Sequence, residues 1–223
     1  MSEAHAIAYR GVHERVKDLV ESADPAALDQ SAPATPEWTV REILCHLVGV
    51  TDDVVNGRLD GIASDAWTAA QVSKRCDASA VDLLAEWDKW SPQFEQMLTD
   101  TPPEIAGQAL FDAATHEHDI RHALGQPGAR DSDAIALAWE WIVLVRPLGG
   151  GPGVRFVTEV GTQEVGDAPV ATIETTRFEV LRATTGRRSV DEIAAYGWDP
   201  EPNPELLLAS NDIFTVRPSP LNE

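Results

Sequence analysis

The sequence predicts a mainly α protein in which a helical N-terminal part is followed by a small α+β domain. In several segments between residues 8 and 145, apolar residues recur every three or four positions, which is the spacing of helices. A glycine-rich segment at 149–153 (GGGPG) then breaks this pattern. Residues 154–160 alternate between apolar and polar side chains, as a strand does. We therefore expect two domains, residues 1–148 and 149–223.

The first two helices are separated by a predicted loop. The first helix is expected over residues 4–23, and the Pro- and Ala-rich segment after it, up to Glu37, is expected to be a loop. A second helix should begin after Thr39, because Thr39 can cap the amide of Glu42 while the Glu42 carboxylate reaches back. This capping box is the best-specified helix start in the chain, and the helical pattern ends near Gly57.

Three further helices complete the N-terminal part. Residues 57–78 are expected to be a loop, and Ser79 opens the third helix, which ends at a Thr-Pro-Pro stop at 101–103. The fourth helix should span residues 105–124. The Gly-Gln-Pro-Gly segment after it supplies a left-handed cap and a residue that cannot continue a helix. A fifth helix begins at residue 131 or 132 and carries apolar side chains at helical spacing.

The C-terminal domain should combine strands with short helices. Two segments rich in β-branched residues, 154–160 and 169–175, are expected to be strands. Two further capping boxes of the form Ser/Thr-x-x-Glu predict short helices over 178–183 and 190–196.

Composition excludes several classes of function. The chain has 223 residues and carries 17 Lys and Arg against 37 Asp and Glu, a formal net charge of −20. This charge repels phosphate backbones and anionic lipids, so we expect no nucleic-acid or membrane partner. A content of 43% hydrophobic residues predicts a packed globular fold. The two cysteines, Cys45 and Cys76, cannot form a disulfide framework, and the N-terminus shows no signal-peptide pattern, so the sequence predicts a cytoplasmic protein.

A group of polar residues on the second and fourth predicted helices could bind a metal ion. Asp112 and His116 lie one helical turn apart on the same face, and Asp119 falls within the same arc. A carboxylate and an imidazole at this spacing, completed by a histidine from a neighbouring helix, can form a three-ligand metal site with an open position. His46 in the second helix can supply that histidine.

Other interpretations of these residues stay open. His46 lies on or beside the apolar face of its helix, where a histidine is commonly a hydrogen-bonded core residue. Asp112 and His116 can equally form an ordinary surface pair. His118 and His122 form a second pair at the same spacing on a different face, and they are an alternative pair of ligands.

Two helical motifs carry a resemblance to a known family. The first, at 38–47, reads WTVREILCHL, and the second, at 111–121, reads FDAATHEHDIR and is followed by LGQPG. Together they resemble the mycothiol-dependent maleylpyruvate isomerase family within the DinB-like superfamily. The segment 178–200, which contains GRR and closes on GWDP, is similar to the smaller C-terminal domain of that family. The resemblance covers nearly the whole chain.

The resemblance implies a DinB-like four-helix bundle that holds a divalent metal, usually zinc. The ligands would be one histidine of the second helix and a carboxylate-x-x-x-His pair of a later helix. His46, Asp112 and His116 match these positions, with Asp in place of the Glu found in some members. The metal would activate the thiol of mycothiol for attack on a small electrophile such as maleylpyruvate. Isomerase members release the thiol again, whereas S-transferase members leave it on the product.

The same interpretation gives roles to four other residues. Asp119 could orient His116 or accept a proton. Arg121 and Arg187 are candidates for binding a carboxylate of the substrate, and Arg187 and Arg188 for binding the thiol cofactor, because a guanidinium can bind a carboxylate through two hydrogen bonds. Two alternatives stay open: a non-catalytic DinB-like protein that uses the metal for binding or in a stress response, and a structural protein without metal.

Overall fold

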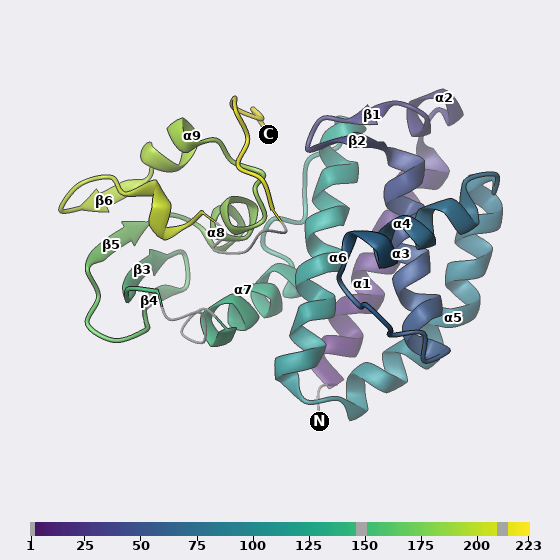
Figure 1. Cartoon of the computed structure of the whole chain (residues 1–223), viewed down its shortest axis with the longest axis horizontal. Helices are drawn as coiled ribbons and strands as arrows, with labels where there is room; N and C mark the ends of the chain where they lie inside the picture. The colour runs from purple at the N-terminus through teal and green to yellow at the C-terminus, as the bar shows by residue number, and fades with distance from the viewer. Residues whose placement is uncertain (1–2, 146–150, 209–213) are drawn as a thin grey trace. The chain divides into compact units, whose positions relative to one another are not determined.

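The computed structural model describes residues 3–145, 151–208 and 214–223 of the chain. The chain divides into two compact units, Met1–Gly128 and Ala129–Glu223, whose elements are labelled in Figure 1. None of the helices in the described ranges combines the length and the hydropathy that a membrane span requires.

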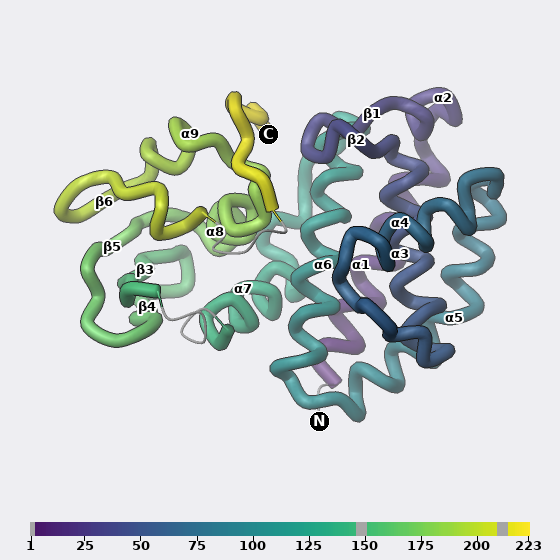
Figure 2. The backbone as a smooth tube through the Cα atoms, viewed as in Figure 1, coloured from purple at the N-terminus to yellow at the C-terminus, as the bar shows by residue number. Residues whose placement is uncertain are grey.

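The N-terminal unit is built on four long helices, which confirms the predicted four-helix bundle. Both α1 and α3 pack against α5 and α6, and the backbone trace in Figure 2 shows the four helices side by side. Each bound lies within two residues of the bound that the sequence predicts. The four helices are α1 (Glu3–Ser22), α3 (Val40–Val55), α5 (Ala80–Asp100) and α6 (Pro103–Ala123).

Local signals in the sequence explain where α3 and α5 begin. At the start of α3, the Thr39 hydroxyl accepts a hydrogen bond from the Glu42 amide, and the Thr39 amide donates to the Glu42 carboxylate at 2.7 Å. The predicted capping box is therefore present. At the start of α5, Ser79 accepts a hydrogen bond from the Asp82 amide at 3.1 Å.

The structure contains three elements in the segment between the first two predicted helices and one in the next predicted loop. Asp24 caps a helix of a single turn, and β1 and β2 pair as an antiparallel ribbon that leads into α3. The four elements are α2 (Pro25–Leu28), β1 (Ser31–Ala32), β2 (Thr35–Thr39) and, in the later segment, α4 (Asp65–Arg75). The first three are too short to show a hydrophobic period.

The helix α4 packs against α3 through polar side chains, which is why the hydrophobic pattern of the sequence does not reveal it. Its buried residues are Gln71 and Arg75. Arg75 donates to Asp52 of α3 at 2.7 Å and to Glu86 of α5 at 2.6 Å. Because both partners are charged, these hydrogen bonds are stronger than neutral ones. They anchor α4 to its neighbours, which an apolar face would do in most helices.

Asp52 should make the stability of the protein depend on pH in the acid range. Burial alone would raise the pKa of Asp52, but hydrogen bonds from Lys74, Arg58 and Arg75 outweigh burial and lower the pKa from 3.8 to about 2. The ionised form therefore stabilises the fold by about 2 kcal/mol above pH 4, and this contribution is lost as the pH falls from about 4 to about 2. Urea unfolding of the wild type and of Asp52→Asn between pH 2 and 7 tests this. The difference in stability should shrink below pH 4, and a constant difference would contradict the prediction.

Gly49 allows α4 to approach α3 closely. A Cβ atom at residue 49 would lie 2.5 Å from Cβ of Gln71, a distance that real Cβ contacts do not show. Gly49→Ala should therefore push the two helices apart and lower the free energy of unfolding by about 1–3 kcal/mol, despite the better helix propensity of Ala. Gly11→Ala is the comparison, because only the flexible end of Arg15 lies within 4 Å there. Equal unfolding free energies for the two variants would contradict the prediction.

The C-terminal unit consists of a small mixed sheet with helices. The sheet has the strand order β4-β3-β5-β6, in which β3 and β5 run parallel and the other two pairs are antiparallel. Its strands are β3 (Val154–Thr158), β4 (Gly161–Val165), β5 (Ala171–Glu174) and β6 (Gly197–Asp199). Its helices are α7 (Asp133–Val145), α8 (Arg177–Thr184), α9 (Val190–Ala194) and the 3-10 turn η2 (Pro204–Leu206).

The boundary between the two compact units, at 128/129, lies twenty residues before the junction that the sequence suggests at 148/149. The fifth predicted helix, α7, packs against α8 and belongs to the C-terminal unit. Trp139 of α7 and Phe156 of β3 contact edge to face, with ring centroids 5.1 Å apart, and anchor α7 to the sheet. Gly149 and Gly150, the first two residues of the glycine-rich segment, lie outside the described residues. The strands β4 and β6 are additions to the two predicted strands.

Candidate metal centre

The structure brings His46, Asp112 and His116 together inside the helical bundle. His46 comes from α3, and Asp112 and His116 come from adjacent turns of α6. One donor atom of each residue lies within 4.8 Å of the other two. Oδ1 of Asp112 is 3.4 Å from Nε2 of His46 and 3.6 Å from Nε2 of His116. The three residues that the sequence suggests as ligands therefore share one site.

The second ring nitrogen of each histidine has a partner of its own. Nδ1 of His46 lies 2.9 Å from Oε1 of Gln71, and Nδ1 of His116 lies 3.1 Å from Oδ2 of Asp119. Both partners are oxygen atoms that accept hydrogen bonds, so each imidazole donates through Nδ1 and presents the lone pair of Nε2 to Asp112. Metal-binding histidines are commonly oriented by this kind of outer hydrogen bond.

Nε2 of His46, Nε2 of His116 and Oδ1 of Asp112 suit a cation, because without one three acceptor atoms face each other. Two imidazole lone pairs and a carboxylate oxygen converge, and neither Nε2 carries a proton in the tautomers that Gln71 and Asp119 select. Burial lowers the pKa of His116, the largest effect on that group, so its ring is neutral at neutral pH. Neutral imidazole is the form that binds metal. Two nitrogens and one oxygen form a donor set that catalytic zinc sites use.

The exposure of the ligands shows from which side the site can be reached. The side chains of His46 and His116 are 6% and 10% exposed, whereas that of Asp112 is 34% exposed. Trp38, from β2, packs near both histidine rings, with its centroid 5.3 Å from that of His46 and 5.8 Å from that of His116. The histidines are thus covered by an aromatic ring, and the site is reached from the side of Asp112.

Trp38 and Gln71 are site residues that the sequence does not reveal as such. Trp38 belongs to the first family motif, but its position before the helix cap gives no sign that β2 carries its ring to the histidines. Gln71 lies on α4, a helix that the sequence does not predict. Only the three-dimensional packing of these two elements assigns them to the site.

The remaining polar residues of α6 have separate environments. Asp119 is fully buried against His116, as an orienting residue would be. His118 is buried and His122 is half-buried, and neither joins a group of three potential ligands within the described residues. The neighbouring thiol, Cys45, is buried, and burial raises its pKa to about 11, so this cysteine is not a thiolate at neutral pH.

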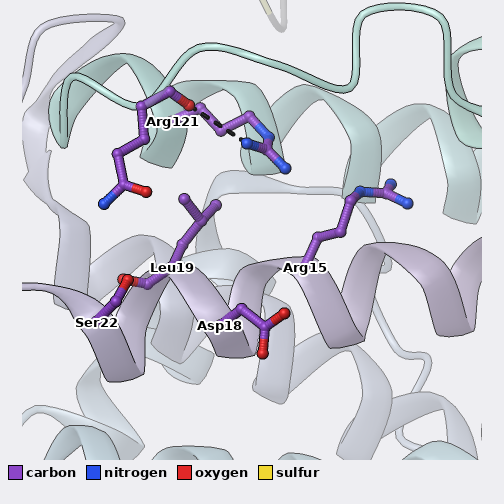
Figure 3. A pocket seen from close by; sticks show the side chains of 6 residues that line it. Arg15, Asp18, Leu19, Ser22 and Arg121 are labelled. Atoms are coloured by element: carbon purple, nitrogen blue, oxygen red, sulfur yellow. Dashed lines mark hydrogen bonds between the residues drawn. The ribbon is translucent and has the colours of Figure 1, made fainter.

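Arg121 lies on the side of α6 that packs against α1. Its Nε donates to Glu117 at 2.9 Å, and its Nη1 donates to the carbonyl of Gln126. Figure 3 shows Arg121 across a cavity of about 220 Å³ from residues of α1, among them Arg15 and Asp18. Its role in binding a substrate carboxylate stays a prediction.

Arg187 and Arg188 belong to the C-terminal unit, where both are buried. Arg188 forms ion pairs with Glu179 at 2.6 Å and Glu223 at 2.9 Å. Glu179 therefore does not complete the capping box that the sequence predicts at Thr176, although Thr176 does accept from the Glu179 amide. Arg187 donates to the carbonyl of Thr185 at 2.6 Å. That these arginines bind a cofactor also stays a prediction.

Comparison with known proteins places the chain in a family. Residues 9–124 match the family described as Mycothiol maleylpyruvate isomerase N-terminal domain, a match that spans more than half of the chain. The chain belongs to this family. The matched segment contains all three candidate ligands, so the candidate metal centre lies within the residues that match the mycothiol maleylpyruvate isomerase family.

Two solved structures resemble most of the chain of this mycothiol maleylpyruvate isomerase family member. One is the mycothiol-dependent maleylpyruvate isomerase, with a TM-score of 0.58, and the other is a histidine-to-alanine variant described by the same name, with a TM-score of 0.61. Each is 13% identical and aligns with 90% of this chain and 94% of its own chain. At this identity the likeness shows the fold alone. No curated protein matches the chain at a significant level.

Proposed function

We propose that this protein is a metal-dependent thiol enzyme, which uses mycothiol to isomerise a small electrophile such as maleylpyruvate or to form a thioether with it. The observation that carries the proposal is the convergence of three acceptor atoms in a site that is open on one side. His46, Asp112 and His116 would hold the divalent metal, with zinc as the expected ion. The bound metal would supply Lewis-acid chemistry, lowering the pKa of a thiol so that it is a thiolate near neutral pH.

Other residues would orient the ligands, shield them and bind the reactants. Gln71 and Asp119 keep the histidine rings oriented, and Trp38 covers them from water. In an isomerase, the thiol sulfur would form a bond to one carbon of the conjugated double bond, and the same bond would break after rotation, so that no thiol is consumed. In an S-transferase, the carbon-sulfur bond would persist. Arg121, Arg187 and Arg188 are the proposed partners of substrate or cofactor carboxylates.

The test of this proposal is a reaction with both substrates. Untagged protein loaded with zinc would be incubated with mycothiol and a panel of electrophiles that includes maleylpyruvate, and products would be followed by NMR. We expect an isomer or an S-conjugate, and none with His116→Ala. If fully zinc-loaded protein yields no product and consumes no thiol, the catalytic proposal fails and the non-catalytic binding protein takes its place.

A further inference from the structure

A chain of hydrogen bonds leads from His46 away from the candidate metal centre. Oε1 of Gln71 lies 2.9 Å from Nδ1 of His46, and Nε2 of Gln71 donates to Oδ2 of Asp53 at 3.0 Å. The other oxygen of Asp53 accepts from Nε of Arg58 at 2.8 Å. These hydrogen bonds thus connect His46 on α3 to Gln71 on α4. From there they return to Asp53 on α3 and end at Arg58, which is half-exposed.

The charge of Asp53 fixes the direction of every hydrogen bond in this chain. An ionised carboxylate only accepts, so Gln71 must turn its NH₂ group toward Asp53 and its carbonyl oxygen toward His46. His46 must then donate through Nδ1, which leaves the Nε2 lone pair for a metal. Arg58 forms an ion pair with the other oxygen of Asp53. The Asp53 carboxylate, which is linked to His46 through two successive hydrogen bonds, therefore selects the tautomer of this candidate ligand.

The surroundings hold this arrangement in place. Gln71 is 1% exposed and Asp53 is 9% exposed, so water competes little for their hydrogen bonds. The absence of a Cβ at Gly49 lets Gln71 approach α3. Arg75, one turn further along α4, is tied to Asp52 and Glu86 and fixes the helix that carries Gln71. The polar face of α4 therefore delivers one side chain to His46.

We propose that Gln71 and Asp53 are positioning residues of the metal centre: through the hydrogen bond to Nδ1, they set the tautomer and the ring orientation of His46, and thereby the affinity for the metal. This inference rests on the proposed function, because it takes His46 to be a ligand. Asp119 would hold His116 in the same way, although it lies on the same helix, α6, whereas Gln71 reaches His46 from α4.

Metal affinity gives the first test. We would measure the dissociation constants of zinc and cobalt by competition with a chelator, using the full chain at pH 8. Gln71→Leu removes both hydrogen bonds at similar volume and should weaken binding by about 10–100-fold. The double variant Gln71→Glu with Asp53→Asn restores an acceptor for His46 and a donor beside it, and should recover at least tenfold of the loss.

The control is Asp52→Asn. Asp52 anchors α4 through Lys74 and Arg75 but makes no contact with Gln71 or His46 among the hydrogen bonds and ion pairs of the described residues. This variant loosens the same helix interface and should keep the affinity within about threefold of the wild type. If Asp52→Asn loses as much affinity as Gln71→Leu, Gln71 only packs the helix and the inference is overturned.

The tautomer of His46 gives a second test that does not need a metal. Nitrogen-15 NMR of the metal-free protein at pH 8 should show the proton of His46 on Nδ1 in the wild type. In Asp53→Asn it should show a mixture with the proton on Nε2, because Gln71 can then rotate its amide. If zinc fails to bind while the Nδ1 proton is present, the proposed function fails, and only the control of the His46 tautomer by Gln71 and Asp53 stands. A wild type that carries the proton on Nε2 would overturn the positioning role itself.

Discussion

Replacing His46 or His116 with alanine should weaken zinc binding by more than a hundredfold. Each change removes one of three donor atoms that lie within 4.8 Å of one another. Loss of an outer hydrogen bond to a ligand commonly costs 10–100-fold in metal affinity, so the loss of the ligand itself should cost more. The measurement is the zinc dissociation constant of untagged protein, together with the zinc content after dialysis against a weak chelator.

The matched control for these variants is His122→Gln. His122 lies on the same helix as His116 and belongs to the alternative pair of ligands that the sequence offers, but it does not join the ligand group in the described residues. The His122→Gln variant should bind zinc with a dissociation constant within about threefold of that of the wild type. If His122→Gln loses zinc while His116→Ala retains it, the assignment of the ligands is wrong.

Glu117→Gln is expected to lower the free energy of unfolding by about 3–5 kcal/mol. The Glu117 side chain is fully buried and receives two hydrogen bonds from Arg15 of α1, at 2.8 and 2.7 Å, and one from Arg121 at 2.9 Å. Figure 3 shows these two arginines beside the cavity between the helices. Without the carboxylate charge, two guanidinium groups would face each other in a poorly solvated place, which is the costly way to break a buried ion pair. Urea unfolding at pH 7 measures the change.

Two further variants test whether the charge of Glu117 is the cause. Glu21→Gln removes an exposed acid from the same unit and should change the stability by less than 0.5 kcal/mol in either direction, roughly the effect of an ordinary surface change. The triple variant Arg15→Met, Glu117→Leu and Arg121→Met removes all three charges and should recover much of the lost stability. A loss below about 1 kcal/mol for Glu117→Gln would show that the network adds little to the bundle.

The long helices were predictable because their signals are strong and local. The capping box of Thr39 and Glu42 and the cap at Ser79 place two helix starts, and apolar periodicity supplies the rest. The helix α4 was not predictable by this route, because it buries Gln71 and Arg75 rather than apolar side chains. Its docking depends on partners that are distant in the sequence, such as Asp52 and Glu86.

The sequence predicts the three candidate ligands of the site but not the residues that surround them. The spacing of Asp112 and His116 on one helix is a local property. His46 was a candidate third ligand from a neighbouring helix, and the resemblance of two motifs to a family favoured it over the alternatives. Gln71 and Trp38 reach the histidines through an unpredicted helix and an unpredicted strand. The division between the units was also not local, since α7 packs on α8 through contacts that its own sequence does not specify.

Anomalous diffraction at the zinc edge tests the central claim most directly. Crystals of the wild type grown with stoichiometric zinc should show one strong peak within bonding distance, about 2.0–2.2 Å, of Nε2 of His46, Nε2 of His116 and a carboxylate oxygen of Asp112. Nδ1 of each histidine should keep its oxygen partner in the same crystals. A peak bound through Nδ1, a peak at His118 or His122, or no peak at these three residues would contradict the account.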